Sequence, residues 1–247
     1  MARADDAAPS GGAAPPDGHP RAGGSAPSPA TSTTGRRASA RRRTPGNEQA
    51  GREHAEVGRP DARPPERVVL ETGAVLRRAR PADAEAFALA VGRSLDHLRP
   101  WMPWASSDNA TVDHQRARLV AADGTWRDGT DMEFAIFDAD EVELIGACGL
   151  MRRVGPGGLE IGYWIDVGHV RRGHATAAAR ALTHGAWVFD DITRVEIRCD
   201  QANVASAAVA ARLGYRLDRT VDRPVEAPGE TGRLMVWTAG RPSPRGR

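Results

Sequence analysis

The chain has 247 residues and a formal net charge of +2, a length that allows one or two domains. No apolar run reaches the ~18 residues of a transmembrane helix, and no apolar signal segment begins the chain. We therefore expect no membrane contact and a cytoplasmic location. Cys148 and Cys199 form no C-x-x-C pair and lie in apolar, strand-like stretches. They predict buried free thiols in a reducing compartment, not a disulfide framework or a metal site.

The first quarter of the chain differs in composition from the rest. Residues 1–66 are dominated by Ala, Pro, Gly, Ser and Arg and contain no Leu, Ile, Phe or Trp. Such a segment buries too little apolar surface to offset its chain entropy. We therefore expect a disordered tail over 1–66, an ordered domain over 67–240 and a second disordered tail over 241–247.

The first tail carries a basic cluster, formed by Arg36, Arg37, Arg41, Arg42 and Arg43. A basic run can contact nucleic acid, but this one has no interleaved aromatic side chains that would stack on bases. A solvated tail, or a start codon assigned too far upstream, is the favoured interpretation. Nucleic-acid binding is expected at most weakly, through this tail.

Apolar alternation and helical spacing predict the elements of the ordered part. Strands are expected at 75–79, 133–137, 144–151, 159–166, 195–199, 215–220 and 233–238. Helices are expected from Pro81 and Asp83 onward, and over 95–104, 112–126, 173–189 and 203–213. This order predicts a mixed α/β or α+β fold with a strand–helix–strand unit in the middle.

The strand over 159–166 places a charge opposite an apolar face. Because side chains alternate along a strand, one face carries Leu159, Ile161, Tyr163 and Ile165. The other face carries Glu160, Gly162 and Trp164. Glu160 either faces solvent at a sheet edge or is a base placed in a cleft.

The junction from this strand to the next helix, residues 165–176, has the features of a phosphate site. A helix start exposes unpaired backbone N–H groups and the positive end of the helix dipole. Gly173 permits close approach of a ligand to the backbone, and Arg171 and Arg172 add positive charge. The combination suits a pyrophosphate, although a solvated helix terminus shares these features. Neither a P-loop nor a dinucleotide fingerprint is present.

Asn203 opens the helix over 203–213, with Ser206 three residues later. Taken alone, this pair is most simply a helix N-cap.

Five segments together carry a family resemblance. They are Leu76 to Asp83, Leu98 to Trp104, Leu159 to Asp166, Arg172 to Thr176, and Asn203 to Tyr215. In their order and spacing they resemble the GNAT superfamily of acyl-CoA-dependent N-acetyltransferases, and within it the RimJ/RimL type of ribosomal-protein alanine N-acetyltransferases. The resemblance spans residues 70–237. It implies a central mixed, mostly antiparallel sheet flanked by helices, with acetyl-CoA as co-substrate and no metal.

The resemblance also implies a role for each matching position. Backbone groups for the pantetheine arm and acetyl carbonyl would come from Ile165, Asp166 and Val167. The pyrophosphate would be held by Arg171, Arg172, Gly173, His174, Ala175 and Thr176. Asn203 would bond to the pantetheine or a water, Ser206 would lie near the sulfur, and Trp101 and Trp104 would shape the acceptor pocket.

The sequence departs from the family pattern at two positions. Val170 stands where Gln or Arg often precedes the phosphate turn, and Arg171 and Arg172 can compensate. Ala210 stands where many relatives carry the tyrosine that protonates the thiolate. Ser206, a water or no donor at all must then serve as the catalytic acid.

The predicted reaction is direct transfer of an acetyl group to a primary amine, with a protein N-terminus the favoured acceptor. Glu160 would accept the amine's proton, directly or through a water, and an N–H near Val167 would stabilise the oxyanion. His169 and His174 are interpreted as surface residues. Two alternatives stay open: acetylation of a small-molecule amine such as an antibiotic or polyamine, and a non-catalytic acetyl-CoA-binding module. The protein is expected to be a monomer or a homodimer.

Overall fold

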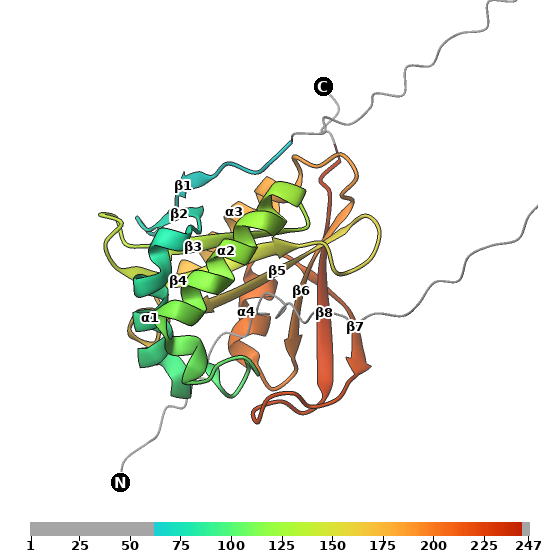
Figure 1. The fold of residues 1–247 in the computed structure, drawn as a ribbon. Helices are drawn as coiled ribbons and strands as arrows, with labels where there is room; N and C mark the ends of the chain where they lie inside the picture. The colour runs from blue at the N-terminus through green and yellow to red at the C-terminus, as the bar shows by residue number, and fades with distance from the viewer. Residues whose placement is uncertain (1–61, 244–247) are drawn as a thin grey trace, which may run out of the picture. The chain divides into compact units, whose positions relative to one another are not determined.

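The computed structural model describes residues 62–243, which contain an eight-stranded sheet and four α-helices (Figure 1). The predictions for residues 1–61 and 244–247, including the basic cluster, lie outside the described residues. None of the helices between residues 62 and 243 combines the length and the apolar character needed to cross a membrane.

Most elements lie where the sequence predicts them. The strands are β1 Arg67–Val69, β2 Val75–Arg78, β3 Asp131–Phe137, β4 Leu144–Met151, β5 Gly158–Ile165, β6 Arg194–Asp200, β7 Arg216–Asp222 and β8 Arg233–Gly240. The helices are α1 Ala84–Leu98, α2 Val112–Asp128, α3 His174–Ala186 and α4 Val204–Arg212. Short 3₁₀ turns are η1 Pro81–Asp83, η2 Asp108–Ala110 and η3 Val167–His169.

The sheet order is β1-β2-β3-β4-β5-β6-β8-β7, and every neighbouring pair is antiparallel except β5 and β6. The expectation of a mixed, mostly antiparallel sheet is therefore confirmed. The parallel pairing joins only residues 158–160 of β5 to residues 194–196 of β6. Beyond Glu160 and Glu196, no residues of the two strands pair with each other.

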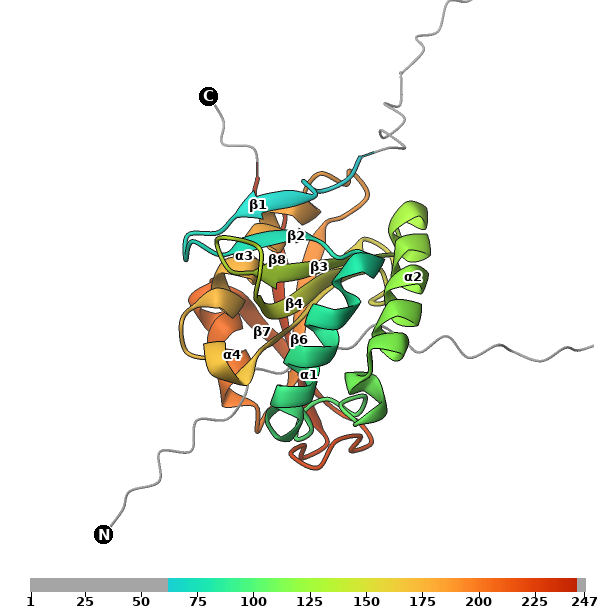
Figure 2. The same ribbon diagram turned by 60° about the vertical axis from the view of Figure 1, so that its left-hand side comes forward.

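Helices cover both faces of the sheet (Figure 2). On one face α3 and α4 enclose a core that contains Leu159 and Tyr163. On the other face α1 and α2 enclose a second core around Phe87, Leu119 and Trp164. Every residue of β5 is buried. The predicted alternation is confirmed, because Leu159, Ile161, Tyr163 and Ile165 belong to the first core and Trp164 to the second.

Local chemistry fixes the ends of α1 and α2. Asp83, just before α1, is buried and accepts two hydrogen bonds from the Arg77 guanidinium, at 2.7 and 2.9 Å. Helix α2 ends at Gly129, whose φ of 70° lies in the left-handed region that glycine adopts without strain.

Two elements differ from prediction. The separate helix predicted over 95–104 is wrong, because α1 continues to Leu98 and ends before Pro100. Strand β1 was not predicted, since three residues are too few to show an alternating pattern.

Residues beyond the predicted domain limits also make contacts. Arg63 donates to the carbonyl oxygen of Arg127 at 2.9 Å, and Arg241 donates to the carbonyl oxygen of Ile192 at 3.1 Å.

Candidate active site

The first feature of the candidate site is an open strand edge. Because pairing with β6 stops at Glu160, no described strand pairs with residues 161–165 of β5 on that side. Backbone N–H and C=O groups need partners when a site closes over them. This edge is therefore suited to an extended ligand that carries amide groups.

A buried carboxylate anchors the end of β5 to α1. Asp166 accepts hydrogen bonds from Arg93 Nε at 2.5 Å, Ser94 Oγ at 2.9 Å and the Gly168 N–H at 2.9 Å. Its side chain is fully buried. Burial acts to raise the pKa of Asp166, but these hydrogen bonds outweigh it and hold the pKa below its ordinary value. The carboxylate thus fixes where the chain leaves the sheet.

The turn between this anchor and α3 concentrates backbone N–H groups. Arg171 has φ of 62° and Gly173 has φ of 82°, so two residues of the turn are left-handed. A left-handed conformation is strained for a non-glycine residue and is typical of functional turns. The first-turn amides of α3, residues 174–176, have no acceptor within the helix. Together with the helix dipole, these amides are suited to bind an anion.

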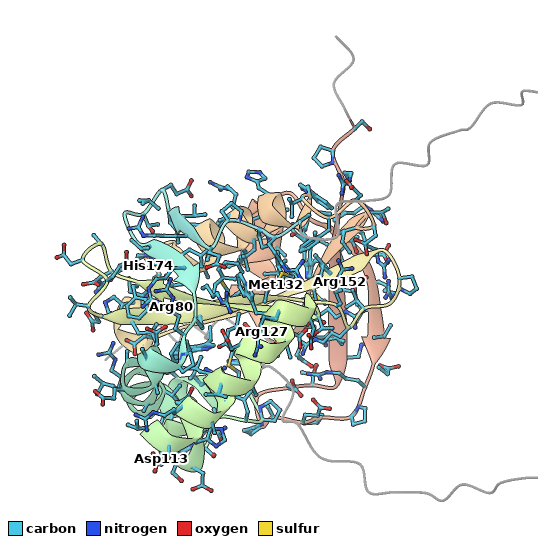
Figure 3. All side chains as sticks on the ribbon, turned by 45° about the horizontal axis from the view of Figure 1, so that its top comes forward. Arg80, Asp113, Arg127, Met132, Arg152 and His174 are labelled. Atoms are coloured by element: carbon cyan, nitrogen blue, oxygen red, sulfur yellow. The ribbon has the colours of Figure 1, made fainter. Side chains whose placement is uncertain are left out.

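This turn forms one wall of a pocket of about 620 Å³. The walls are residues 169–171 and 173–176, the α4 side chains Ala205, Ala208, Val209 and Arg212, the β1–β2 turn residues Glu71 and Thr72, and the single residues Ile165 and His97. Figure 3 shows His174 beside the strands that begin the described chain. Arg171 and Arg212 supply the positive charge at this pocket.

Six of the predicted cofactor residues line this pocket: Ile165, Arg171, Gly173, His174, Ala175 and Thr176. His174 is buried, not a surface residue as expected, and its Nδ1 lies 3.0 Å from Thr72 Oγ1. Burial, with His169 and Arg172 nearby, lowers the pKa of His174.

Three predicted residues of the junction do not line the pocket. The Asp166 side chain is engaged with α1, and Arg172 donates to the carbonyl oxygen of Gly168 at 2.9 Å. The Val167 N–H donates to Ser94 Oγ at 3.1 Å. This hydrogen bond conflicts with the expectation that the Val167 N–H is free to stabilise an oxyanion.

Asn203 and Ser206 lie at the start of α4, beneath the pocket. Asn203 Oδ1 accepts from the Ser206 N–H at 3.1 Å, which is the N-cap arrangement. The Ser206 hydroxyl is fully buried and lies 2.9 Å from the Tyr163 hydroxyl. Burial raises the pKa of Tyr163, so its hydroxyl stays protonated over the whole neutral range. Two coupled hydroxyls therefore lie between β5 and α4.

Glu160 lies at the opposite end of β5. Its carboxylate is bound by both Arg153 Nε, at 3.0 Å, and Arg153 Nη2, at 2.7 Å. Its neighbour in register, Glu196, binds Arg198 at 2.7 Å and Arg194 at 2.9 Å. These five side chains form an ion cluster, in which the two glutamates are almost fully buried.

This cluster is remote from the pocket. Glu160 lies five positions before Ile165, a span of roughly 16 Å at strand rise. Figure 3 agrees, because Arg152, next to the cluster, and His174, in the pocket, lie on different sides of the molecule. The structure thus does not bring Glu160 to the predicted cofactor residues, and its ion pairs give it a structural role at the last register pair of the parallel strands.

Trp101 and Trp104 follow α1 and pack on the α1–α2 face. The Trp104 ring meets the Trp164 ring edge-on at 6.3 Å, and the indole N–H groups of Trp101 and Trp104 are buried with no partner among residues 62–243. Trp164 also borders a second, smaller pocket, which Gly149 and Gly162 help to line. The tryptophans are therefore on the other side of β5 from α4.

The sequence analysis missed two polar residues of the pocket. Arg212, in the last turn of α4, has no local signal that separates it from other exposed arginines. His97, on α1, directly precedes the segment 98–104 that carried the family resemblance, and the sequence did not single it out. Its position becomes evident only when α1 is placed against the end of β5.

Comparison with known proteins agrees with this geometry. A family profile described as "Acetyltransferase (GNAT) domain" matches residues 74–216. The curated protein "Uncharacterized N-acetyltransferase YjdG" of Bacillus subtilis is 29% identical over 117 residues, which cover 47% of this chain and 68% of that protein. "Ribosomal-protein-serine acetyltransferase" of Escherichia coli is 37% identical over 87 residues, 34% of this chain and 47% of that protein.

Among solved structures, the RimL ribosomal L7/L12 α-N-protein acetyltransferase in complex with coenzyme A is similar in fold. Its TM-score is 0.64 at 23% identity, and the match covers 71% of this chain and 98% of that one.

Proposed function

Because the chain belongs to the GNAT acetyltransferase family, an enzyme family that takes acetyl-CoA as co-substrate, we propose that its acceptor is the N-terminal amine of a protein. The observation that carries the proposal is the continuity of three features along one path. These are the amides of the α3 turn, the pocket of about 620 Å³ and the unpaired edge of β5.

Each feature suits one part of the co-substrate. The amides of residues 173–176, with Arg171 and Arg212, would hold the diphosphate. The unpaired edge of β5 would accept the two amides of the pantetheine arm, as a further strand would. The thioester would then lie near the gap between β5 and α4, where Tyr163 and Ser206 meet.

The leaving thiolate needs little assistance. We propose that the Ser206 hydroxyl, hydrogen-bonded to that of Tyr163, is the proton source near the sulfur. It would replace the tyrosine that many relatives carry at the position of Ala210. Both cysteines are buried. Burial raises the pKa of Cys199 to about 11, so a thiolate nucleophile is negligible at neutral pH. Direct attack by the amine is therefore the proposed route.

The choice of a protein N-terminus rests on two supports. The Escherichia coli relative and the RimL structure are both named for acetylation of ribosomal proteins. In addition, the aromatic residues Trp101 and Trp104 pack on the face of β5 away from α4, with buried indole N–H groups that have no hydrogen-bond partner within the described residues 62–243. These N–H groups are donors only, and peptide carbonyl groups are suitable acceptors for them.

Calorimetric titration with coenzyme A tests the cofactor site. Gly173→Glu adds a carboxylate beside the proposed diphosphate at a residue whose φ of 82° already disfavours a side chain. We expect affinity to fall at least about 100-fold, equivalent to ~2.7 kcal/mol. Gly240→Glu is the matched control, because a side chain there meets open space. Unchanged affinity of Gly173→Glu would refute this site.

Release of free thiol in the presence of candidate amines tests the acceptor. We expect turnover with peptides that begin with Ala or Ser, and little with polyamines or aminoglycosides. Turnover of the small amines alone would contradict the proposed acceptor. Coenzyme A binding without turnover of any amine would favour a binding module.

A further inference from the structure

One polar side chain of the pocket contacts neither the phosphate turn nor the Asp166 anchor through a hydrogen bond. His97, in the last turn of α1, lines the pocket together with Ile165 and Ala205. Its Nε2 atom is buried and has no hydrogen-bond partner among residues 62–243. A buried polar atom without a partner is costly and uncommon, and it indicates an unbound water, ligand or reacting group.

The other titratable side chains of the pocket are already engaged. They are Glu71, His169, Arg171, His174 and Arg212. Glu71 is ion-paired with Arg180, His169 contacts Asp166 and Glu143, and His174 contacts Thr72. The two arginine guanidinium groups are donors only and have no acceptor atom. His97 is thus the side chain of this pocket best suited to accept a proton.

Its place in the fold matches that task. His97 reaches the pocket from α1, whereas the phosphate turn and α4 form the opposite walls. One turn earlier on α1, Arg93 and Ser94 bind Asp166 directly after Ile165. His97 is therefore held beside the end of β5, on the helix that also leads to Trp101.

We propose that His97 is the catalytic base, whose Nε2 accepts the proton of the attacking amine. This inference rests on the proposed function, since it requires the thioester to occupy the pocket. It replaces the remote Glu160 in that role.

Burial keeps the imidazole of His97 neutral. Burial lowers the pKa of His97, and the Asp166 carboxylate only partly offsets this effect. Arg93 neutralises Asp166 from the same helix, and the charged groups across the pocket are Glu71, Arg171 and Arg212. At neutral pH the ring is uncharged, and with its proton on Nδ1 the Nε2 lone pair is free.

The proton and electron transfers balance without another reactant. The substrate ammonium gives one proton to Nε2, which leaves a neutral amine and an imidazolium. The amine lone pair forms the N–C bond to the thioester carbonyl carbon. The C–S bond then breaks, and its electron pair leaves on the sulfur. The nitrogen gives up its second proton as the C–S bond breaks, and this proton replaces the one that the Ser206 hydroxyl supplies to the thiolate. His97 then returns the first proton to solvent, so one proton is released per turnover.

Kinetics of the full chain with a reactive peptide test the proposal. His97→Gln keeps a polar side chain of similar size and removes the base. We expect kcat to fall about 10²–10⁴-fold, with coenzyme A affinity within about twofold of the original. The original protein should also lose activity below the pKa of His97, and this acidic limb should vanish in the variant. Retained turnover, or an unchanged acidic limb, would overturn the proposal.

His184→Gln is the matched control, since His184 is exposed on α3 and lies outside the pocket. It should keep the original kcat and pH profile. If His184→Gln lost as much turnover as His97→Gln, the loss would not be specific to the pocket and the proposal would fail.

A second measurement separates this proposal from the proposed function. In protein with ¹³C-labelled histidine, the His97 ring signal is identified by its loss in His97→Gln, and coenzyme A is then added. We expect the signal to shift on binding and to report a neutral ring at pH 7. Failure of coenzyme A to bind would remove the proposed function itself. Binding without any effect on His97, or a ring protonated at pH 7, would overturn only the role of His97.

Discussion

The anchor at Asp166 predicts a large effect from one substitution. Asp166→Ala removes the acceptor of three hydrogen bonds, from Arg93 at 2.5 Å, Ser94 at 2.9 Å and the Gly168 N–H at 2.9 Å. Hydrogen bonds to a charged group contribute about 1.5–3 kcal/mol each, and they are not additive. Arg93 keeps a second partner, Glu143 at 2.9 Å, so its charge is not left unpaired.

We therefore expect Asp166→Ala to lower the free energy of unfolding by about 3 kcal/mol, near the lower bound for breaking a buried ion pair. For a domain of this size the Tm should fall by roughly 6–12 °C. The folded-state pKa of Asp166 is lowered, so its contribution is present at neutral pH. It should shrink as the pH falls below about 4, the ordinary pKa of the group.

Denaturant unfolding at pH 7 and at about pH 2, well below the ordinary pKa of the group, measures this difference. The control is Asp96→Ala on the same helix, because Asp96 is almost fully exposed and pairs only with Arg99 among the described contacts. That variant should change stability by less than about 1 kcal/mol. A cost for Asp166→Ala no larger than that of the control would refute the anchoring of α1 to β5.

Three further outcomes follow from the same geometry. Glu160→Gln should lower the Tm by several degrees through the loss of charge pairing to Arg153, and should keep the acidic limb of the pH profile. A 100-fold loss of kcat at unchanged Tm would instead restore Glu160 as the base. Trp104→Ala should raise KM for the peptide and not for acetyl-CoA, and the opposite split would contradict its acceptor role. Cys148 and Cys199 should resist thiol reagents in the folded protein, because burial raises both pKa values, and rapid labelling would contradict that burial.

Local patterns in the sequence were sufficient for most of the fold. Alternation in β5 correctly predicted that Tyr163 and Trp164 face different cores, and the polar turn with Gly173 correctly predicted the start of α3. Both are properties of near neighbours in the chain. The order of strands and helices, with the family resemblance, then predicted the mixed sheet.

Contacts between distant segments decided what the sequence did not reveal. In the sequence, Glu160 has the charge and the apolar neighbours expected of a catalytic base. In the structure it binds Arg153, and it lies beside Glu196 because β5 and β6 pair only at that end. His97 looks like an ordinary helical residue until Arg93 and Asp166, 73 positions apart, fix α1 at the end of β5. Neither arrangement leaves a periodic signal.

A crystal structure of the protein with coenzyme A tests the central claim most directly. The account predicts that the diphosphate accepts hydrogen bonds from the amides of residues 173–176. We also expect the pantetheine arm to follow the unpaired edge of β5 from Ile165 to Tyr163, with its sulfur near the Ser206 hydroxyl and within reach of His97. Coenzyme A bound elsewhere on the chain, or with its sulfur at the Glu160 end of β5, would contradict the account.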